Sequence, residues 1–119
     1  MKKYELLQAE FIIRSDVTLY RIRALKAFGT VNVGDIGGYI EKEECLSHDG
    51  NAFVYGDAMV SGAARISGAA FVYENARISG AAFVYENARV SGAARVSGNA
   101  WISGDAMVSG AAQIGRAHV

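Results

Sequence analysis

The sequence has little of what marks a disulfide-bonded, membrane-spanning or nucleic-acid-binding protein. Cys45 is its only cysteine, so no disulfide can form within the chain, and this fits a reducing compartment. Basic and acidic side chains number 12 each and are balanced in both halves, so no basic patch points to nucleic acid or an anionic membrane. Glu5, Gln8 and Glu10 interrupt any signal-peptide core, and no apolar run approaches the roughly 20 residues that span a bilayer. We therefore expect a soluble, cytoplasmic protein with no nucleic-acid or membrane partner.

What the chain has instead is a six-residue repeat that runs from Asn51 to Arg116. It comprises eleven blocks, and the second position of every block is Ala. The fourth position is Val or Ile in all eleven, and the sixth is Gly in eight of them. Repeats of this regularity decide the architecture before weaker signals are weighed.

Each block predicts a short strand followed by a corner. The Ala and the Val or Ile are two positions apart, so a strand directs both side chains to the same side. The residues after them, such as Ser61-Gly62, are turn formers. A helix is disfavoured, because a Gly in every block would cost about 1 kcal/mol each time. Ala suits a crowded corner, and Val or Ile fills the middle of a side.

Three blocks per coil would give an 18-residue triangular turn. The predicted fold class is therefore all-β: a single-stranded parallel β-helix, or β-solenoid, in which each coil covers the interior of its neighbour. Its handedness does not follow from these arguments, because the general crossover rule favours the right hand. The expectation of a left-handed coil rests on similarity to known hexapeptide repeats.

The first fifty residues lack the strict period. Residues 17–26 alternate as a strand does. Because the open end of a solenoid must be covered, we expect a small N-terminal β cap over residues 1–35. The solenoid is then expected over residues 36–119, with Tyr39-Ile40 and Cys45-Leu46 as early, irregular rungs.

Several segments of this region also carry a family resemblance. They are LYRIRALKAF (19–28), GGYI (37–40), Glu44, LS (46–47), Gly50 and FVYGDA (53–58). Together they resemble the opening of the YdcK-type β-solenoid proteins, which are described as transferases on the basis of their fold. The resemblance implies a left-handed β-helix behind a small cap, and it transfers no catalytic residue. Similar openings occur in bacterial and phage proteins.

The C-terminal residues depart from the repeat. The next Ala-x-Val triplet, Ala117-His118-Val119, arrives one position early, and such a slip reverses the side chains that face inward. The string 114–119 also resembles the translation of a sequencing adapter. One hypothesis is that residues 115–119 are not native and that the natural protein continues; the alternative is a genuine irregular ending.

An enzyme hypothesis comes from hexapeptide-repeat acyltransferases. These are typically trimers that bind an acyl-thioester cofactor between subunits and use a His as general base. His48 lies outside the regular repeat, where we expect an exposed turn residue, and His118 lies in the doubtful tail. Cys45 could act as a nucleophile only beside an activating base, so packing in an early rung is the favoured interpretation. We expect no catalytic residue, metal site or cofactor.

The third and fifth positions of the blocks face outward if Ala and Val face inward. An 18-residue coil then brings aromatic side chains of neighbouring coils together. The candidate interaction surface consists of Phe53, Tyr55, Phe71, Tyr73, Phe83, Tyr85 and Trp101. Exposed aromatic strips can mark binding or self-association surfaces. The competing interpretation is that they only stabilise neighbouring rungs, as cross-strand pairs do.

The leading hypothesis is a non-enzymatic structural or interaction protein, associated with phages or mobile elements, that displays repeated surfaces. It would self-associate through the aromatic strips or through an open C-terminal coil, whose backbone groups lack partners. One alternative is an acyltransferase-like protein truncated at its C-terminus. A second is a filament former similar to bactofilins.

Overall fold

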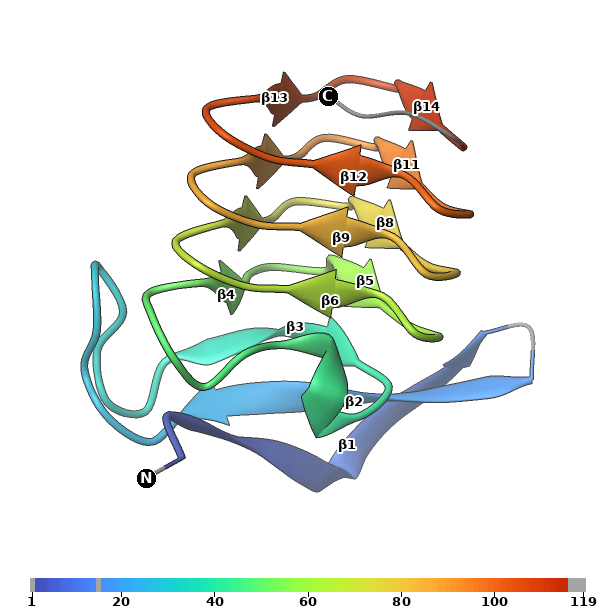
Figure 1. The fold of residues 1–119 in the computed structure, drawn as a ribbon. Helices are drawn as coiled ribbons and strands as arrows, with labels where there is room; N and C mark the ends of the chain where they lie inside the picture. Colours follow the sequence, from blue (N-terminus) through green and yellow to red (C-terminus); the bar gives the residue numbers. More distant parts are fainter. Residues whose placement is uncertain (1, 15, 116–119) are drawn as a thin grey trace.

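The repeat folds into stacked coils above a β-sheet base, as Figure 1 shows for the computed structural model, which describes residues 2–14 and 16–115. Each block contributes one two-residue strand. The eleven strands of the repeat are β4 (Phe53–Val54), β5 (Met59–Val60), β6 (Arg65–Ile66), β7 (Phe71–Val72), β8 (Arg77–Ile78), β9 (Phe83–Val84), β10 (Arg89–Val90), β11 (Arg95–Val96), β12 (Trp101–Ile102), β13 (Met107–Val108) and β14 (Gln113–Ile114). Each strand starts one block after the previous one, so the period of the sequence is the period of the structure.

Three blocks make one coil, and the coils stack in parallel register. Phe53 pairs with Phe71 and Arg77 with Arg95, so each residue meets its equivalent three blocks further along the chain. The three sides are the β4 side (β4, β7, β10, β13), the β5 side (β5, β8, β11, β14) and the β6 side (β6, β9, β12). The prediction of an all-β parallel β-solenoid is confirmed. The left-handed sense stays a prediction.

The second and fourth positions of the blocks fill the interior, as the alternation predicts. The buried members are Ala52, Val54, Ala58, Val60, Ala64, Ile66, Ala70, Val72, Ala76, Ile78, Ala82, Val84, Ala88, Val90, Ala94, Val96, Ala100, Ile102 and Val108. Each such Val or Ile contributes roughly 2 kcal/mol of transfer free energy, which is the main force that holds the coils together. The small Ala lets the chain turn at the corner beside it.

The sixth position of each regular block sits in the left-handed backbone region. Glycine reaches that region without strain, and Gly62 has a φ of 68°. Glu74 and Glu86 replace this glycine and still adopt a φ of 60°. Their carboxylates reach the next coil, where they accept the N–H of Gly92 and of Gly104, each at 3.0 Å. These two hydrogen bonds offset the strain and link successive coils.

The base beneath the coils is an antiparallel sheet. It contains β1 (Tyr4–Arg14), β2 (Val17–Ala24) and β3 (Ile36–Ile40). Strand β3 pairs with β2 on one side and, in parallel, with β5 on the other. It therefore joins the predicted cap to the coils, although the predicted boundary at residue 35 remains untested.

Gly37 and Gly38 allow β3 to lie tightly under the first full coil. A Cβ added at Gly38 would be 2.7 Å from the carbonyl oxygen of Ala58. No other residue type fits at that distance without moving the backbone of the coil above. The tight contact closes the lower end of the apolar interior.

The first rung is irregular at one corner. Phe53 pairs with Phe71 three blocks away, whereas Leu46 bridges to Ile66, which is two positions beyond the regular offset. The corner 47–52 is therefore longer than its counterparts by those two positions. It follows a single turn of 3-10 helix, η1 (Glu43–Cys45), and it carries His48. The prediction of early rungs is confirmed for Tyr39-Ile40, which pair with Met59 and Val60, and for Leu46, which bridges to Ile66, while Cys45 ends η1.

Within the described part of the chain, no helix has the length and apolarity that crossing a membrane requires. Of the tail that resembles an adapter translation, residues 116–119 lie outside the described residues. Gln113 and Ile114 still pair in register with Arg95 and Val96, so the repeat continues to that point.

Candidate functional site

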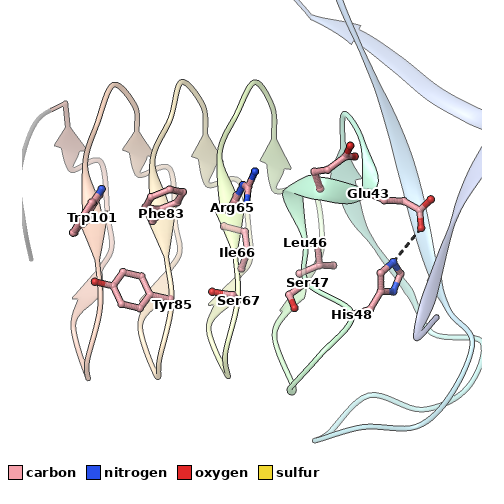
Figure 2. A pocket seen from close by; sticks show the side chains of 11 residues that line it. Glu43, Leu46, Ser47, His48, Arg65, Ile66, Ser67, Phe83, Tyr85 and Trp101 are labelled. Atoms are coloured by element: carbon pink, nitrogen blue, oxygen red, sulfur yellow. Dashed lines mark hydrogen bonds and ion pairs between the residues drawn. The ribbon is translucent and has the colours of Figure 1, made fainter. Parts of the chain in front are cut away.

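The β6 side carries a groove of about 720 Å³ that runs along the coil axis and meets the base at one end. Figure 2 shows its residues in two rows on neighbouring coils, with His48 and Glu43 at the end nearest the base. The lining consists of Glu43, Glu44, Leu46, Ser47, His48, Arg65, Ile66, Ser67, Phe83, Tyr85 and Trp101. It combines an aromatic wall with a polar end, which is the usual character of a ligand site.

The stacking of the coils assembles the aromatic wall. Trp101 pairs directly with Phe83, and their ring centroids are 5.8 Å apart with a 43° tilt. Tyr85 follows Phe83 two positions later in the same block and therefore projects from the same side. Arg65 occupies the equivalent position one coil below Phe83. The predicted proximity of Phe83, Tyr85 and Trp101 is thus present in the structure.

The polar end of the groove carries both signs of charge. Lys2 donates to Glu43 at 3.0 Å and, with a contribution from His48, holds the pKa of that carboxyl below its ordinary value against the opposing effect of burial. Glu44 and Arg65 form no ion pair with other described residues. The groove therefore offers one available anion and one available cation, with no net charge between them.

His48 is engaged through both ring nitrogens. Nδ1 accepts the backbone N–H of Lys3 at 3.2 Å, so the neutral ring carries its proton on Nε2, which donates to Glu43 at 3.0 Å. The ring also stacks on Tyr4 at 4.2 Å with a 12° interplanar angle. The expectation of an exposed turn residue is wrong, because the N-terminal strand packs against this corner. Because both ring nitrogens are hydrogen-bonded within the protein, His48 is a structural side chain in this arrangement.

Cys45 is buried inside the first rung, as the packing interpretation predicted. Its Sγ lies 3.9 Å from the carbonyl oxygen of Gly62. Burial raises the pKa of the thiol, which disfavours the reactive thiolate. Among the described residues, no group of three His, Cys, Asp or Glu side chains gathers in a way that could hold a metal ion.

The remaining aromatic candidates gather on the β4 side. Tyr55 contacts Phe71 with centroids 5.6 Å apart, and Tyr55, Phe71 and Tyr73 line a smaller hollow with Thr30 and Arg89. Phe53 was expected to be exposed with them, and this is wrong, because its exposed fraction is zero. The ring of Phe28, from the loop after β2, covers it edge-on at 5.5 Å. Phe53 therefore belongs to the core.

Sequence reasoning did not place Arg65, Ser67 or the η1 acids in the groove. The coil period contains the signal for the first two, because Arg65 and Ser67 lie three blocks before Phe83 and Tyr85. The acids had no comparable signal, since their position depends on the longer corner and on contacts with the N-terminal strand.

Comparison with known proteins supports the architecture. The model of the YdcK beta solenoid repeat matches residues 52–68, 82–98 and 100–116. A search of curated proteins finds no match. The three matched segments all lie in the repeat, whose coils, register and inward Ala and Val positions are described above. The repeat of this chain is therefore a β-solenoid of the YdcK type.

Proposed function

We propose that this protein is a non-enzymatic interaction scaffold and that the groove on the β6 side binds a neutral oligosaccharide. The observation that carries the proposal is the joining of a stacked aromatic wall to a polar end without net charge. The coils supply a rigid frame, because every rung is hydrogen-bonded to the next.

The aromatic wall suits the apolar faces of sugar rings. Trp101, Phe83 and Tyr85 present ring surfaces from adjacent coils, and aromatic faces attract the polarised C–H groups of a pyranose. The rings of Phe83 and Trp101 stand one rung apart, so an oligomer can contact both. This repetition favours a chain-like ligand over a single small molecule.

The polar end suits hydroxyl groups. Ser47, Ser67 and Tyr85 both donate and accept, while Glu44 accepts and Arg65 donates. A neutral polyhydroxylated ligand can satisfy all of these without leaving a buried charge unpaired. A strongly charged ligand would meet one like charge for every opposite charge.

A catalytic role has weaker support from the same residues. A general base needs a free lone pair within reach of its substrate. Both nitrogens of His48 are already engaged, and Cys45 is enclosed. The acyltransferase alternative would require His48 to leave Lys3 or Glu43 before it could act.

Intrinsic fluorescence tests the proposal, because Trp101 is the chain's only tryptophan and lines the groove. Titration with maltohexaose, cellohexaose and the N-acetylglucosamine hexamer is expected to give a saturable change in Trp101 emission with at least one of them. Phe83→Ala should weaken that binding about tenfold, since truncating a central aromatic contact costs more than about 1 kcal/mol.

Phe71→Ala is the matched control, because residues 69–74 and 81–86 have the same sequence, AAFVYE, on different sides of the coil. This variant should bind like the wild type. Equal weakening by both variants, or no saturable response to any of the three sugars, would contradict the proposal. Tighter binding of acetyl-CoA than of the sugars would favour the acyltransferase alternative instead.

Four sequence-based expectations stay predictions. Self-association through the predicted aromatic strips on the two sides of the coil is one, and stacking through the last coil is another. Phage or mobile-element association rests on the resemblance alone, and a cytoplasmic location rests on composition. Gene neighbours and cell fractionation test the last two.

A further inference from the structure

We propose that two copies of this chain pair through the free edge of β1, in an antiparallel arrangement centred on Ile12. Strand β1 is the first strand of the seven-stranded sheet, whose order is β1-β2-β3-β5-β8-β11-β14. Its outer edge thus has no neighbouring strand among the described residues. The far end of the β1–β2 hairpin projects beyond the stacked coils, where a second molecule can approach it (Figure 1).

The part of β1 suited to pairing is its last four residues. Phe11, Ile12, Ile13 and Arg14 pair regularly with β2, whereas residues 8–10 form an irregularity between Leu7 and Phe11. Phe11 and Ile13 are 51% and 57% exposed, which is unusual for such large apolar side chains. The irregularity limits a new ladder to this short segment and to Glu10, which directly precedes it.

The backbone of this segment has groups available for a partner. Arg14 and Val17 flank a two-residue connection, and in such hairpins the flanking residues exchange the ladder hydrogen bonds. By alternation, the N–H and C=O groups of Phe11 and Ile13 then point away from β2. In agreement, the carbonyl of Ile13 accepts a local hydrogen bond from the Arg14 guanidinium at 3.0 Å.

A two-fold axis at Ile12 pairs these backbone groups, and the side chains beside them, with complementary groups of the second copy. Phe11 lies opposite Ile13 of the second copy, so both exchange backbone hydrogen bonds and form an apolar cross-strand pair. Glu10 lies opposite Arg14 of the second copy. Both are exposed, and neither forms an ion pair with other described residues. The register therefore yields two Glu–Arg pairs and two Phe–Ile pairs from one short strand.

This complementarity favours a second copy over an unrelated peptide. A self-pairing strand needs opposite charges at equal distances on the two sides of its centre, and Glu10 and Arg14 are each two positions from Ile12. Apolar residues also flank the centre on both sides. A strand that binds diverse partners has no need for this symmetry.

Sedimentation velocity across a concentration series tests the proposal. The full chain is expected to show a monomer–dimer equilibrium. Glu10→Arg or Arg14→Glu alone places like charges opposite each other and should weaken the dimer at least tenfold, whereas the double reversal Glu10→Arg/Arg14→Glu should restore it. Monomer at every concentration, or a dimer that the single reversals leave unchanged, overturns the proposal.

Crosslinking tests the register independently of stability. Ile12→Cys places two thiols opposite each other across the axis, at the short separation of a non-hydrogen-bonded pair, where a disulfide can form. Oxidation should give a covalent dimer. Ile13→Cys is the matched control, because residue 13 faces residue 11 of the second copy, and it should crosslink far less. Cys45 is buried and stays out of the reaction. Equal crosslinking of both variants would overturn the register.

Discussion

The buried ammonium of Lys3 gives a prediction about stability and pH. Its Nζ donates to the carbonyl oxygens of Ala52 at 2.6 Å and Gly50 at 3.3 Å, and it lies 4.5 Å from the centroid of the Phe28 ring. No carboxylate forms an ion pair with it among the described residues. Burial, with a smaller contribution from Lys26, lowers the pKa of Lys3 from 10.5 to about 8, and Asp49 opposes this.

The sign of the effect follows from proton binding. Between pH 8 and 10.5 the unfolded chain keeps the Lys3 proton while the folded protein loses it, so the free energy of unfolding rises with pH. At about 1.4 kcal/mol per pH unit, the contribution approaches roughly 3 kcal/mol above pH 10.5. Neutral Lys3 can still donate to both carbonyl oxygens, so these contacts survive deprotonation.

The Cys45 thiol and the Tyr4 hydroxyl change the free energy of unfolding in the opposite direction as pH rises. Burial raises the pKa of Cys45 and of Tyr4, and each removes stability as pH rises through the ordinary pKa of its side chain. The measurement is therefore a difference: urea unfolding of the wild type and of Lys3→Met at pH 7, 8, 9 and 10. Both proteins contain Cys45 and Tyr4, so the difference isolates Lys3.

The wild type should gain roughly 2 kcal/mol relative to Lys3→Met between pH 7 and pH 10. Lys2→Met is the control, because Lys2 is exposed and bonds to Glu43; its curve should run parallel to that of the wild type over this range. A difference that stays constant or falls with pH would refute the reasoning.

Two further predictions concern the coil itself. Gly38→Ala should lower the free energy of unfolding by about 1–3 kcal/mol in urea titrations, because the added Cβ would overlap the carbonyl oxygen of Ala58. Gly115→Ala is the control: its added Cβ meets nothing within 4 Å, so the free energy of unfolding should change by less than about 0.5 kcal/mol. Glu74→Ala should cost about 1 kcal/mol by losing the hydrogen bond to Gly92 while keeping the left-handed backbone strain. Glu74→Gly should come within about 0.5 kcal/mol of the wild type in the same assay, because relief of the strain compensates for the lost bond. Equal losses for the two Glu74 variants would contradict this account of the corner.

Local patterns predicted the coil because each six-residue block contains both its inward-facing residues and its corner. The alternation of Ala58 and Val60 defines an inner face, and Gly62 defines a corner, without reference to distant residues. The same period correctly placed Phe83 beside Trp101. Handedness did not follow, because an alternating pattern is the same in either sense of winding.

The sequence-based expectations were wrong where segments that are distant in the sequence pack against each other. Phe53 occupies an outward position, yet Phe28 covers it from a loop that the repeat says nothing about. His48 sits in a corner that pattern alone predicts to be exposed, yet Tyr4 and Lys3 cover it from the far end of the N-terminal segment. Glu74 replaces the glycine expected at the sixth position, and its hydrogen bond to the next coil cannot be predicted from the sequence of a single block.

Stacking of each residue on its equivalent three blocks later underlies both aromatic surfaces of the coils, and one crosslink tests it directly. Arg77 and Arg95 are exposed partners on adjacent coils, and neighbouring strands are about 4.8 Å apart, within reach of a disulfide. Under mild oxidation, Arg77→Cys/Arg95→Cys should form an intramolecular disulfide detectable by peptide mass spectrometry, while Arg77→Cys/Arg89→Cys, on different sides of the coil, should not. Efficient crosslinking of the second pair and none of the first would contradict the solenoid.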